Sequence, residues 1–284
     1  MDRRARIVSD SVSEAALIAE TPGPRTRESL AEDLRRAGLR AGDVLILHSS
    51  LKAVGWVSGG PVAVLLAFQD VLTETGTLIV PTQTSHLTDP AGWENPPVLQ
   101  DWVPIIRASV PAFDPLRTPS RDMGAIAETL RTWPGALRSA HPHVSFAAWG
   151  RHADHITRDH QLAWSMGEGS PLHRAYSLDA RTLLLGTRSC TSLHLAEALS
   201  GTVGTTSAAG AVIQDGRRVW ATFPDWDYST DVFPEILEAF CADHQVPEHR
   251  IGSASSLLLD QRALVDFAVD FLRRSAQDGA PRRP

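Results

Sequence analysis

The sequence is poor in several features that mark whole classes of protein. Its 284 residues include only two cysteines, Cys190 and Cys241, which cannot form a disulfide framework, so we expect a reducing compartment. No apolar run approaches membrane-spanning length, and residues 1–20 lack the apolar core and small-residue cleavage site of a signal peptide. These absences predict a cytoplasmic protein with no membrane partner.

An excess of positive charge is also missing. Lys and Arg number 27 against 33 Asp and Glu, which gives a net charge of −6. This balance argues against a nucleic-acid partner, which usually meets a basic face, and suits a cationic ligand. The glycine spacings of the Walker A motif and of the dinucleotide fingerprint are absent. His141 and His143 have no third ligand nearby in the sequence, so we expect no metal.

The composition that remains, 43% hydrophobic and 21% charged, is typical of a globular protein with a full core. Short apolar runs at 44–47, 77–80 and 182–185 indicate buried strands, and helical patterns cover 26–37 and 61–72. This order predicts a three-layer α/β/α sandwich with parallel strands. We expect residues 1–25 to be a mobile leader with a short helix over 14–20, and residues 26–284 to form a single domain.

A proline-rich stretch, Thr82–Arg117, interrupts this pattern. A long excursion inside a compact domain is usually a lid or a binding element, so residues 82–117 are predicted to form a smaller inserted subdomain. Its Trp93, Glu94 and Asp101 combine aromatic rings with carboxylates, which suits a cationic, partly apolar ligand. The alternative is an insertion that only packs its own tryptophans.

The stretch Arg181–Leu199 has the strongest catalytic pattern. Its apolar run ends at Gly186, and Thr191 and Ser192 can each cap the helix that follows. His194 then falls in the first helical turn, where the unpaired N–H groups and the dipole disfavour a protonated imidazole. A neutral His194 is a candidate general base, with Glu197 one turn on. The alternative is a histidine that satisfies a local hydrogen bond.

Asp215-Gly216 lies between the alternating runs 211–214 and 218–223, which predicts a β-hairpin. Asp225 and Asp227 follow it two residues apart, so in extended chain they share a face. Two carboxylates there can orient a histidine and bind ammonium groups. A solvated acidic loop is the alternative.

Taken together, several segments resemble the aminoglycoside 3-N-acetyltransferase family from about Thr26 to Leu272. The joint order and spacing make the resemblance specific, and the segments that carry it are LHSSLKAVGWVSGGP (47–61), NPPV (95–98), PAFDPLRTPSRDMG (111–124), RTWPGALRSAHPHVSFAAWG (131–150), GEGSPL (167–172), LLLG with TSLHLAE (183–197) and LVDFAV (264–269). The resemblance implies an α/β fold distinct from the GNAT fold. It also implies acetyl-CoA as donor and acetylation of the 3-amino group of the deoxystreptamine ring, with aminoglycoside resistance as the outcome.

The resemblance also implies roles for particular residues. His194 matches the catalytic base, Asp225 and Asp227 its partner carboxylates, and Thr191 a residue that helps hold the oxyanion. The implied acetyl-CoA contacts are Ser49, Ser50, Leu51, Ser120, Met123, Ser139, His141, Ser145 and Phe146. We expect the aminoglycoside to bind in a cleft between the body and the excursion. The expected contact residues are Trp56, Trp93, Glu94, Asp101, Glu168 and Glu197. The protein is expected to be a monomer or a homodimer.

Three other hypotheses stay open at this point. The turn Thr187–Cys190 is shorter than in many relatives, which favours a different amine as acceptor. A protein that only binds aminoglycoside or coenzyme A is a second alternative, although His194 with Asp225 and Asp227 argues against it. The third is ping-pong transfer through Cys190, because a thiolate at a helix start would be activated.

Overall fold

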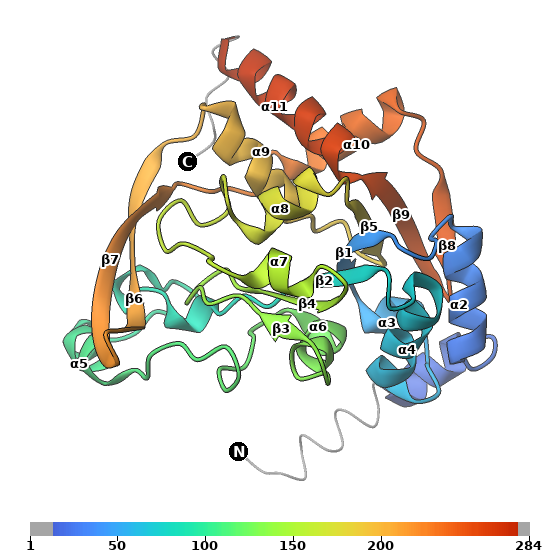
Figure 1. Ribbon diagram of the computed structural model, residues 1–284, viewed down its shortest axis with the longest axis horizontal. Helices are drawn as coiled ribbons and strands as arrows, with labels where there is room; N and C mark the ends of the chain where they lie inside the picture. Colours follow the sequence, from blue (N-terminus) through green and yellow to red (C-terminus); the bar gives the residue numbers. More distant parts are fainter. Residues whose placement is uncertain (1–13, 278–284) are drawn as a thin grey trace.

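A mixed sheet of seven strands, in the order β3-β4-β2-β1-β5-β9-β8, forms the centre of the computed structural model, which describes residues 14–277 (Figure 1). Its three central strands are parallel: β2 (Thr77–Pro81), β1 (Val44–Ser49) and β5 (Arg181–Leu185). The outer strands are antiparallel to their inner neighbours: β3 (Leu137–Arg138), β4 (Phe146–Gly150), β9 (Ala254–Asp260) and β8 (Glu248–Ile251).

Both faces of the sheet are buried, because successive side chains of each strand point to opposite sides. In β1, Leu45 and Leu47 belong to one apolar cluster, whereas Val44 and Ile46 belong to the other. The strands therefore read as unbroken apolar runs, and two helical layers are needed to cover them. The three-layer α/β/α sandwich predicted from the sequence is confirmed.

Helices pack on each face and mostly begin and end where the sequence indicates. One cluster includes residues of α2 (Arg27–Arg36), α3 (Leu51–Val54), α4 (Gly60–Leu72) and α6 (Gly124–Arg131). The other includes residues of α7 (Ala153–Thr157), α8 (Pro171–Ser177), α9 (Ser192–Ser200), α10 (Phe233–Asp243) and α11 (Gln261–Gln277). None of the helices within residues 14–277 is long and apolar enough to cross a bilayer.

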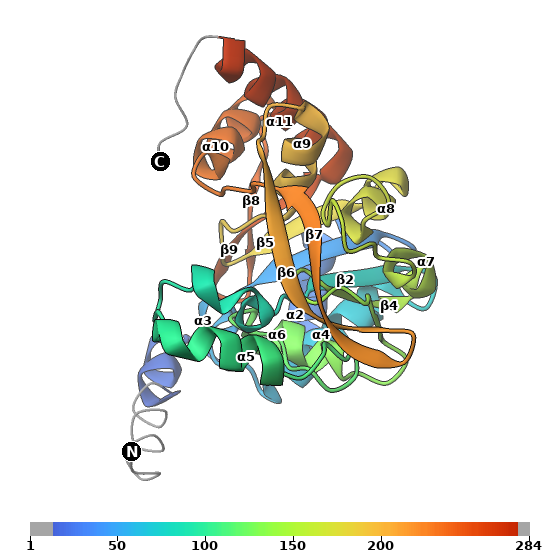
Figure 2. The same cartoon turned by 90° about the vertical axis from the view of Figure 1, so that its left-hand side faces the viewer.

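A long β-hairpin stands apart from the main sheet. Its strands are β6 (Thr205–Gln214) and β7 (Arg217–Trp226), longer than the sequence runs suggested, and Asp215 and Gly216 turn between them with φ of 50° and 73°. Two positive φ values fit a type I′ turn, as the Asp-Gly pair predicts. The hairpin runs from the end of α9 down to the excursion that contains α5 (Val103–Ser109) (Figure 2).

The excursion after β2 is folded rather than irregular. It contains η1 (Ser85–Leu87), η2 (Pro90–Gly92), η3 (Gln100–Trp102) and α5 (Val103–Ser109). Arg107 donates to both carboxylate oxygens of Asp89 at 3.0 and 2.7 Å, which ties its two halves together. Arg218 of β7 donates to the carbonyl of Val110 at 2.7 Å. The excursion and the hairpin thus support each other, while a lid function remains a prediction.

The start of the chain departs from the expected boundary at Thr26. Residues 14–20 form the predicted short helix, and hydrogen bonds join this end of the chain to Trp56, while the mobility of the leader stays a prediction. The Trp56 indole N–H donates to Glu14 at 3.1 Å, and the Trp56 backbone N–H donates to the Thr21 hydroxyl at 2.9 Å. Residues 1–13, the first half of the expected leader, lie outside the described part of the chain.

Candidate active site

The carboxyl ends of β1 and β5 lie side by side and bring the site together. After β5 the chain turns at Gly186, which has φ of +66° and sits so close to α3 that a Cβ there would lie 2.4 Å from the Cβ of Ala53. The chain then enters α9, with Thr191 at its N-cap and His194 in its first turn, as predicted. Ligands of open α/β sheets bind at such carboxyl edges.

His194 is paired with Glu197. Its Nδ1 lies 2.8 Å from Glu197 Oε2, and both residues are buried. The other carboxylate oxygen accepts from the backbone N–H of Ser229 at 3.1 Å. A carboxylate oxygen at this distance is an acceptor for an Nδ1–H group, an arrangement that leaves Nε2 as the ring nitrogen not used by Glu197. The rings of Tyr228 and Phe233 contact the imidazole at centroid distances of 5.1 and 4.8 Å and fix its plane.

This pairing corrects the partner expected for the histidine. Asp225 accepts from the backbone N–H and hydroxyl of Ser165 at 3.0 and 2.6 Å, so it holds the loop before α8. Its hydrogen bonds within residues 14–277 do not include one to His194, which acts on it only through charge. Burial raises its pKa above the usual value. Asp227 is exposed, whereas Asp225 is buried, so the two do not act as a pair on one face. Where the hairpin passes α9, the Asp225 side chain is buried and the Asp227 side chain is exposed.

Thr191 meets a residue that the sequence did not single out. Its hydroxyl lies 3.3 Å from Nε2 of His48 at the end of β1, and it makes no side-chain cap to α9. Burial, with a smaller effect of nearby His194, lowers the pKa of His48 to about 4. A neutral His48 can therefore fix the direction of the Thr191 hydroxyl. The only sequence signal was a polar residue directly after a buried strand.

Cys190 is not placed for nucleophilic attack. Its side chain is buried, and burial raises the pKa of its thiol to about 12. The thiolate is the reactive form of cysteine, so this environment opposes a covalent acetyl intermediate. The ping-pong hypothesis loses its physical basis here.

Four of the expected acetyl-CoA residues lie together beside the site. Ser50 caps α3 by accepting from the Ala53 N–H at 3.3 Å. Leu51 and Met123 pack at the margin of the core, and a Cβ on Gly124 would lie 3.7 Å from the Ser49 carbonyl. The start of α6 therefore adjoins the β1–α3 turn. Their contact with the donor remains a prediction.

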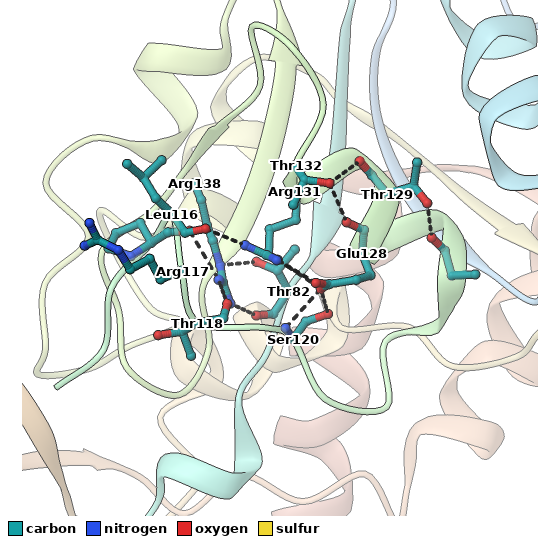
Figure 3. Close-up of polar contacts among 12 residues, drawn as sticks. Thr82, Leu116, Arg117, Thr118, Ser120, Glu128, Thr129, Arg131, Thr132 and Arg138 are labelled. Atoms are coloured by element: carbon teal, nitrogen blue, oxygen red, sulfur yellow. Dashed lines mark hydrogen bonds and ion pairs between the residues drawn. The ribbon is translucent and has the colours of Figure 1, made fainter. Parts of the chain in front are cut away.

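Ser120 lies in a polar network that anchors the returning end of the excursion (Figure 3). Glu128 of α6 accepts from the Ser120 hydroxyl and backbone N–H at 2.6 and 3.0 Å, and it pairs with Arg131 at 2.6 Å. Arg138 donates to the Thr82 carbonyl at 2.7 Å, and burial lowers its pKa to about 10. Ser120 thus holds the loop that leads to Met123.

Four expected donor contacts are instead buried structural groups: Ser139, His141, Ser145 and Phe146. His141 Nδ1 accepts from the His143 and Val144 N–H groups, both at 3.1 Å. Ser145 donates to the Thr82 carbonyl at 2.8 Å. These hydrogen bonds support the strands around β4, and contact of the four residues with coenzyme A stays a prediction.

The expected acceptor residues are dispersed. The Trp56 indole N–H donates to Glu14 in the N-terminal helix, and Glu197 is the partner of His194, while their contact with an acceptor stays a prediction. Trp93 donates to Thr88 at 2.9 Å, while Glu94 and Asp101 are exposed. Among residues 14–277, no hydrogen bond, ion pair or ring contact links these three to α9. Glu168 lines a pocket beside α9 together with Trp164 and Trp226, two indoles missed at the level of sequence.

The fold and site define a class of enzyme before any comparison. An imidazole hydrogen-bonded to a buried carboxylate, at the carboxyl edge of an α/β sheet, is an arrangement found in enzymes that use general acid–base chemistry. In the described part of the chain, no group of three or more His, Cys, Asp or Glu side chains has the arrangement of a metal site.

Comparison with known proteins then identifies the family. The family model described as aminoglycoside 3-N-acetyltransferase matches residues 46–273. The SPbeta prophage-derived aminoglycoside N(3')-acetyltransferase-like protein YokD of Bacillus subtilis (strain 168) is 41% identical, over 89% of this chain and 94% of its own. Aminoglycoside N(3)-acetyltransferase VII of Streptomyces paromomycinus is 38% identical, over 92% and 96%. The chain belongs to the aminoglycoside 3-N-acetyltransferase family.

A solved structure in this group concerns the donor. AAC-IIIb in a binary complex with CoASH superposes with a TM-score of 0.79 at 32% identity, covering 92% of this chain and all (100%) of that one. Membership of the family and its α/β fold, which the resemblance implied, are confirmed.

Proposed function

We propose that this protein transfers the acetyl group of acetyl-CoA directly to the 3-amino group of a deoxystreptamine ring in an aminoglycoside. The single observation that carries the proposal is the buried His194–Glu197 pair, with Nδ1 and Oε2 2.8 Å apart. The names of the relatives supply the acceptor class, and the coenzyme A complex of AAC-IIIb supplies the donor.

The reaction begins with a proton problem. An ammonium group has no lone pair to attack a thioester, so the acceptor must lose a proton to a base. Nε2 of His194 takes that proton, directly or through one water, while Glu197 holds the ring and balances the charge of the imidazolium that forms. The amine nitrogen then bonds to the carbonyl carbon of the thioester.

The tetrahedral intermediate that results carries its negative charge on the former carbonyl oxygen. The Thr191 hydroxyl, directed by His48, donates to this oxyanion. Collapse breaks the C–S bond. The proton that His194 holds passes to the departing thiolate, and the nitrogen, which carries one proton too many after attack, releases it to solvent water as the neutral amide forms. The β1–α3 turn, with Ser49, Ser50 and Leu51, and Met123 before α6 hold the donor beside the base.

An assay of thiol release from acetyl-CoA tests the proposal against a panel of aminoglycosides and simple amines. We expect release with deoxystreptamine-containing compounds and a product acetylated at the 3-amino nitrogen by NMR. Faster turnover of a simple amine than of every aminoglycoside would show a different acceptor. Expression in a susceptible host tests resistance, which should be lost in His194→Ala.

A further inference from the structure

A pocket of about 530 Å³ beside α9 has no role in the steps described above. Trp164, Gly167 and Glu168 of the loop before α8 line it, together with Ala198 of α9 and Trp226 at the end of β7. It combines two indole faces with a carboxylate. Glu168 is exposed and has no hydrogen bond or ion pair with another residue between 14 and 277.

Trp164 is held in this pocket at a conformational cost. Its φ is +58°, in the left-handed region that bulky residues avoid. Its N–H donates to the Pro224 carbonyl at 3.1 Å, and its carbonyl accepts from Gly167 at 2.9 Å. Yet its side chain is 38% exposed, so the strain does not serve burial of the ring. The indole lies 4.6 Å from that of Trp226, tilted by 46°.

A chain of buried hydrogen bonds fixes the base of the pocket. His160 bonds the Ser139 hydroxyl through Nδ1 at 2.9 Å and the Ser165 carbonyl through Nε2 at 2.7 Å. Ser165 in turn donates to Asp225 at 2.6 Å. This chain joins the strand region around β4 to β7 through the residue that follows Trp164. Both indoles are thereby positioned before any ligand arrives, which lowers the cost of ordering them on binding.

The pocket lies one helical turn from the base. Ala198 follows His194 by four residues in α9, so the two share a face and are separated by about 6 Å along the axis. A sugar ring adjoining the one acetylated at His194 spans a similar length. The Glu168 carboxylate would gain no ion pair from a neutral ligand and would repel an anion, so the pocket suits a cationic ligand.

We propose that this pocket binds the ammonium-bearing sugar ring next to the deoxystreptamine ring of the acceptor. The ring stacks on Trp164 and Trp226, and its ammonium group pairs with the indole face and with Glu168. The inference rests on the proposed function. It assigns Trp164 and Glu168 to acceptor recognition and leaves the chemistry to α9.

Three acceptors test it by steady-state kinetics. These are 2-deoxystreptamine, neamine, which adds one amino-sugar ring, and paromamine, which has a hydroxyl in place of one neamine ammonium group. Trp164→Leu should raise KM for neamine about 5- to 30-fold at unchanged kcat, because it removes binding that precedes the chemistry. KM for 2-deoxystreptamine, which does not reach the pocket, should change less than about twofold in the same variant.

Glu168→Gln provides a second test that keeps the side-chain shape. It should reduce the preference for neamine over paromamine by about two- to fivefold, the size expected for an exposed ion pair. Glu74→Gln is the matched control: it makes the same charge change in the exposed turn before β2, at the opposite edge of the sheet, and should leave this preference unaltered.

Two failures are distinguishable. Wild-type KM values for neamine in both pocket variants would overturn the subsite while leaving the acetyltransfer proposal intact. If the wild-type protein acetylates none of the three compounds, the proposed function is wrong, and calorimetric binding of neamine then decides the subsite. Binding weakened by Trp164→Leu would support it, and binding equal to wild type would overturn it.

Discussion

At the scale of single residues, the partner of His194 decides how the base works. Glu197 approaches Nδ1 to 2.8 Å, whereas Asp227 is exposed. Glu197→Gln keeps a hydrogen-bond acceptor but removes the charge that balances the imidazolium. We expect kcat to fall by about 10- to 100-fold, less than the roughly 10²–10⁴-fold loss in His194→Ala. A larger loss in Asp227→Asn than in Glu197→Gln, measured by thiol release, would contradict this assignment.

A second residue-scale prediction concerns Thr191 and His48, whose side chains lie 3.3 Å apart. Thr191→Val removes an oxyanion donor, which typically costs about 10²–10³-fold in kcat. His48→Asn should cost less, because it acts only through the hydroxyl. In the double variant, the His48 change should add almost nothing to the loss from Thr191→Val. Independent, multiplying losses in kcat would show that His48 does not act through Thr191.

At the scale of elements, the turn that joins β5 to α9 depends on the absence of a side chain at Gly186. A Cβ there would lie 2.4 Å from that of Ala53 in α3, on a backbone with φ of +66°. Gly186→Ala should therefore destabilise the fold by about 2–4 kcal/mol, from overpacking added to backbone strain. Thermal unfolding measures the effect.

The matched control for this element is Gly201 at the other end of α9. It has φ of +71°, but a Cβ there meets nothing within 4 Å. Gly201→Ala carries the backbone strain alone and should cost about 1 kcal/mol. Equal falls in Tm for the two variants would mean that the approach of α3 to the turn is unimportant.

At the scale of the whole molecule, buried histidines make the fold sensitive to acid. Burial lowers the pKa of His48, His143 and His160 to about 4, and that of His141 well below its usual value. In the unfolded chain the pKa of each histidine is about 6.5. Below pH 6.5 the unfolded chain therefore binds more protons than the native state. Stability is fully present above pH 6.5 and is lost as the pH falls toward 4, by roughly 3 kcal/mol for each of His48, His143 and His160.

Urea unfolding between pH 7.5 and 4.5 measures this loss. We expect the free energy of unfolding to fall steeply across this pH range. His160→Gln removes one titrating group, so between pH 7.5 and pH 4.5 this variant should lose less of its unfolding free energy than the wild type does. A wild-type curve that is flat between pH 6.5 and 4.5 would contradict the prediction.

The sequence by itself determined the main elements and the place of the candidate base. Apolar runs predicted the central strands, Asp215-Gly216 predicted the hairpin, and the position of His194 in the first turn of α9 followed from its distance to Thr191. These features depend on neighbours a few residues apart, whose spacing sets geometry directly. Glu197 lies one helical turn from His194 in the sequence. Spacing alone, however, could not show that Glu197 rather than Asp225 or Asp227 pairs with the imidazole.

Only the tertiary structure decided which distant groups meet. The path of β7 past α9 turned Asp225 toward Ser165 and left Asp227 exposed. The parallel pairing of β1 with β5 brought His48 to Thr191. Burial of Ser139 and His141 could not be predicted either, because a polar residue at a strand end satisfies a partner inside the protein or a ligand outside it with the same atoms. The packing of the loop before α8 on β7 gave these polar residues partners inside the protein. The same packing created the pocket between the two indoles.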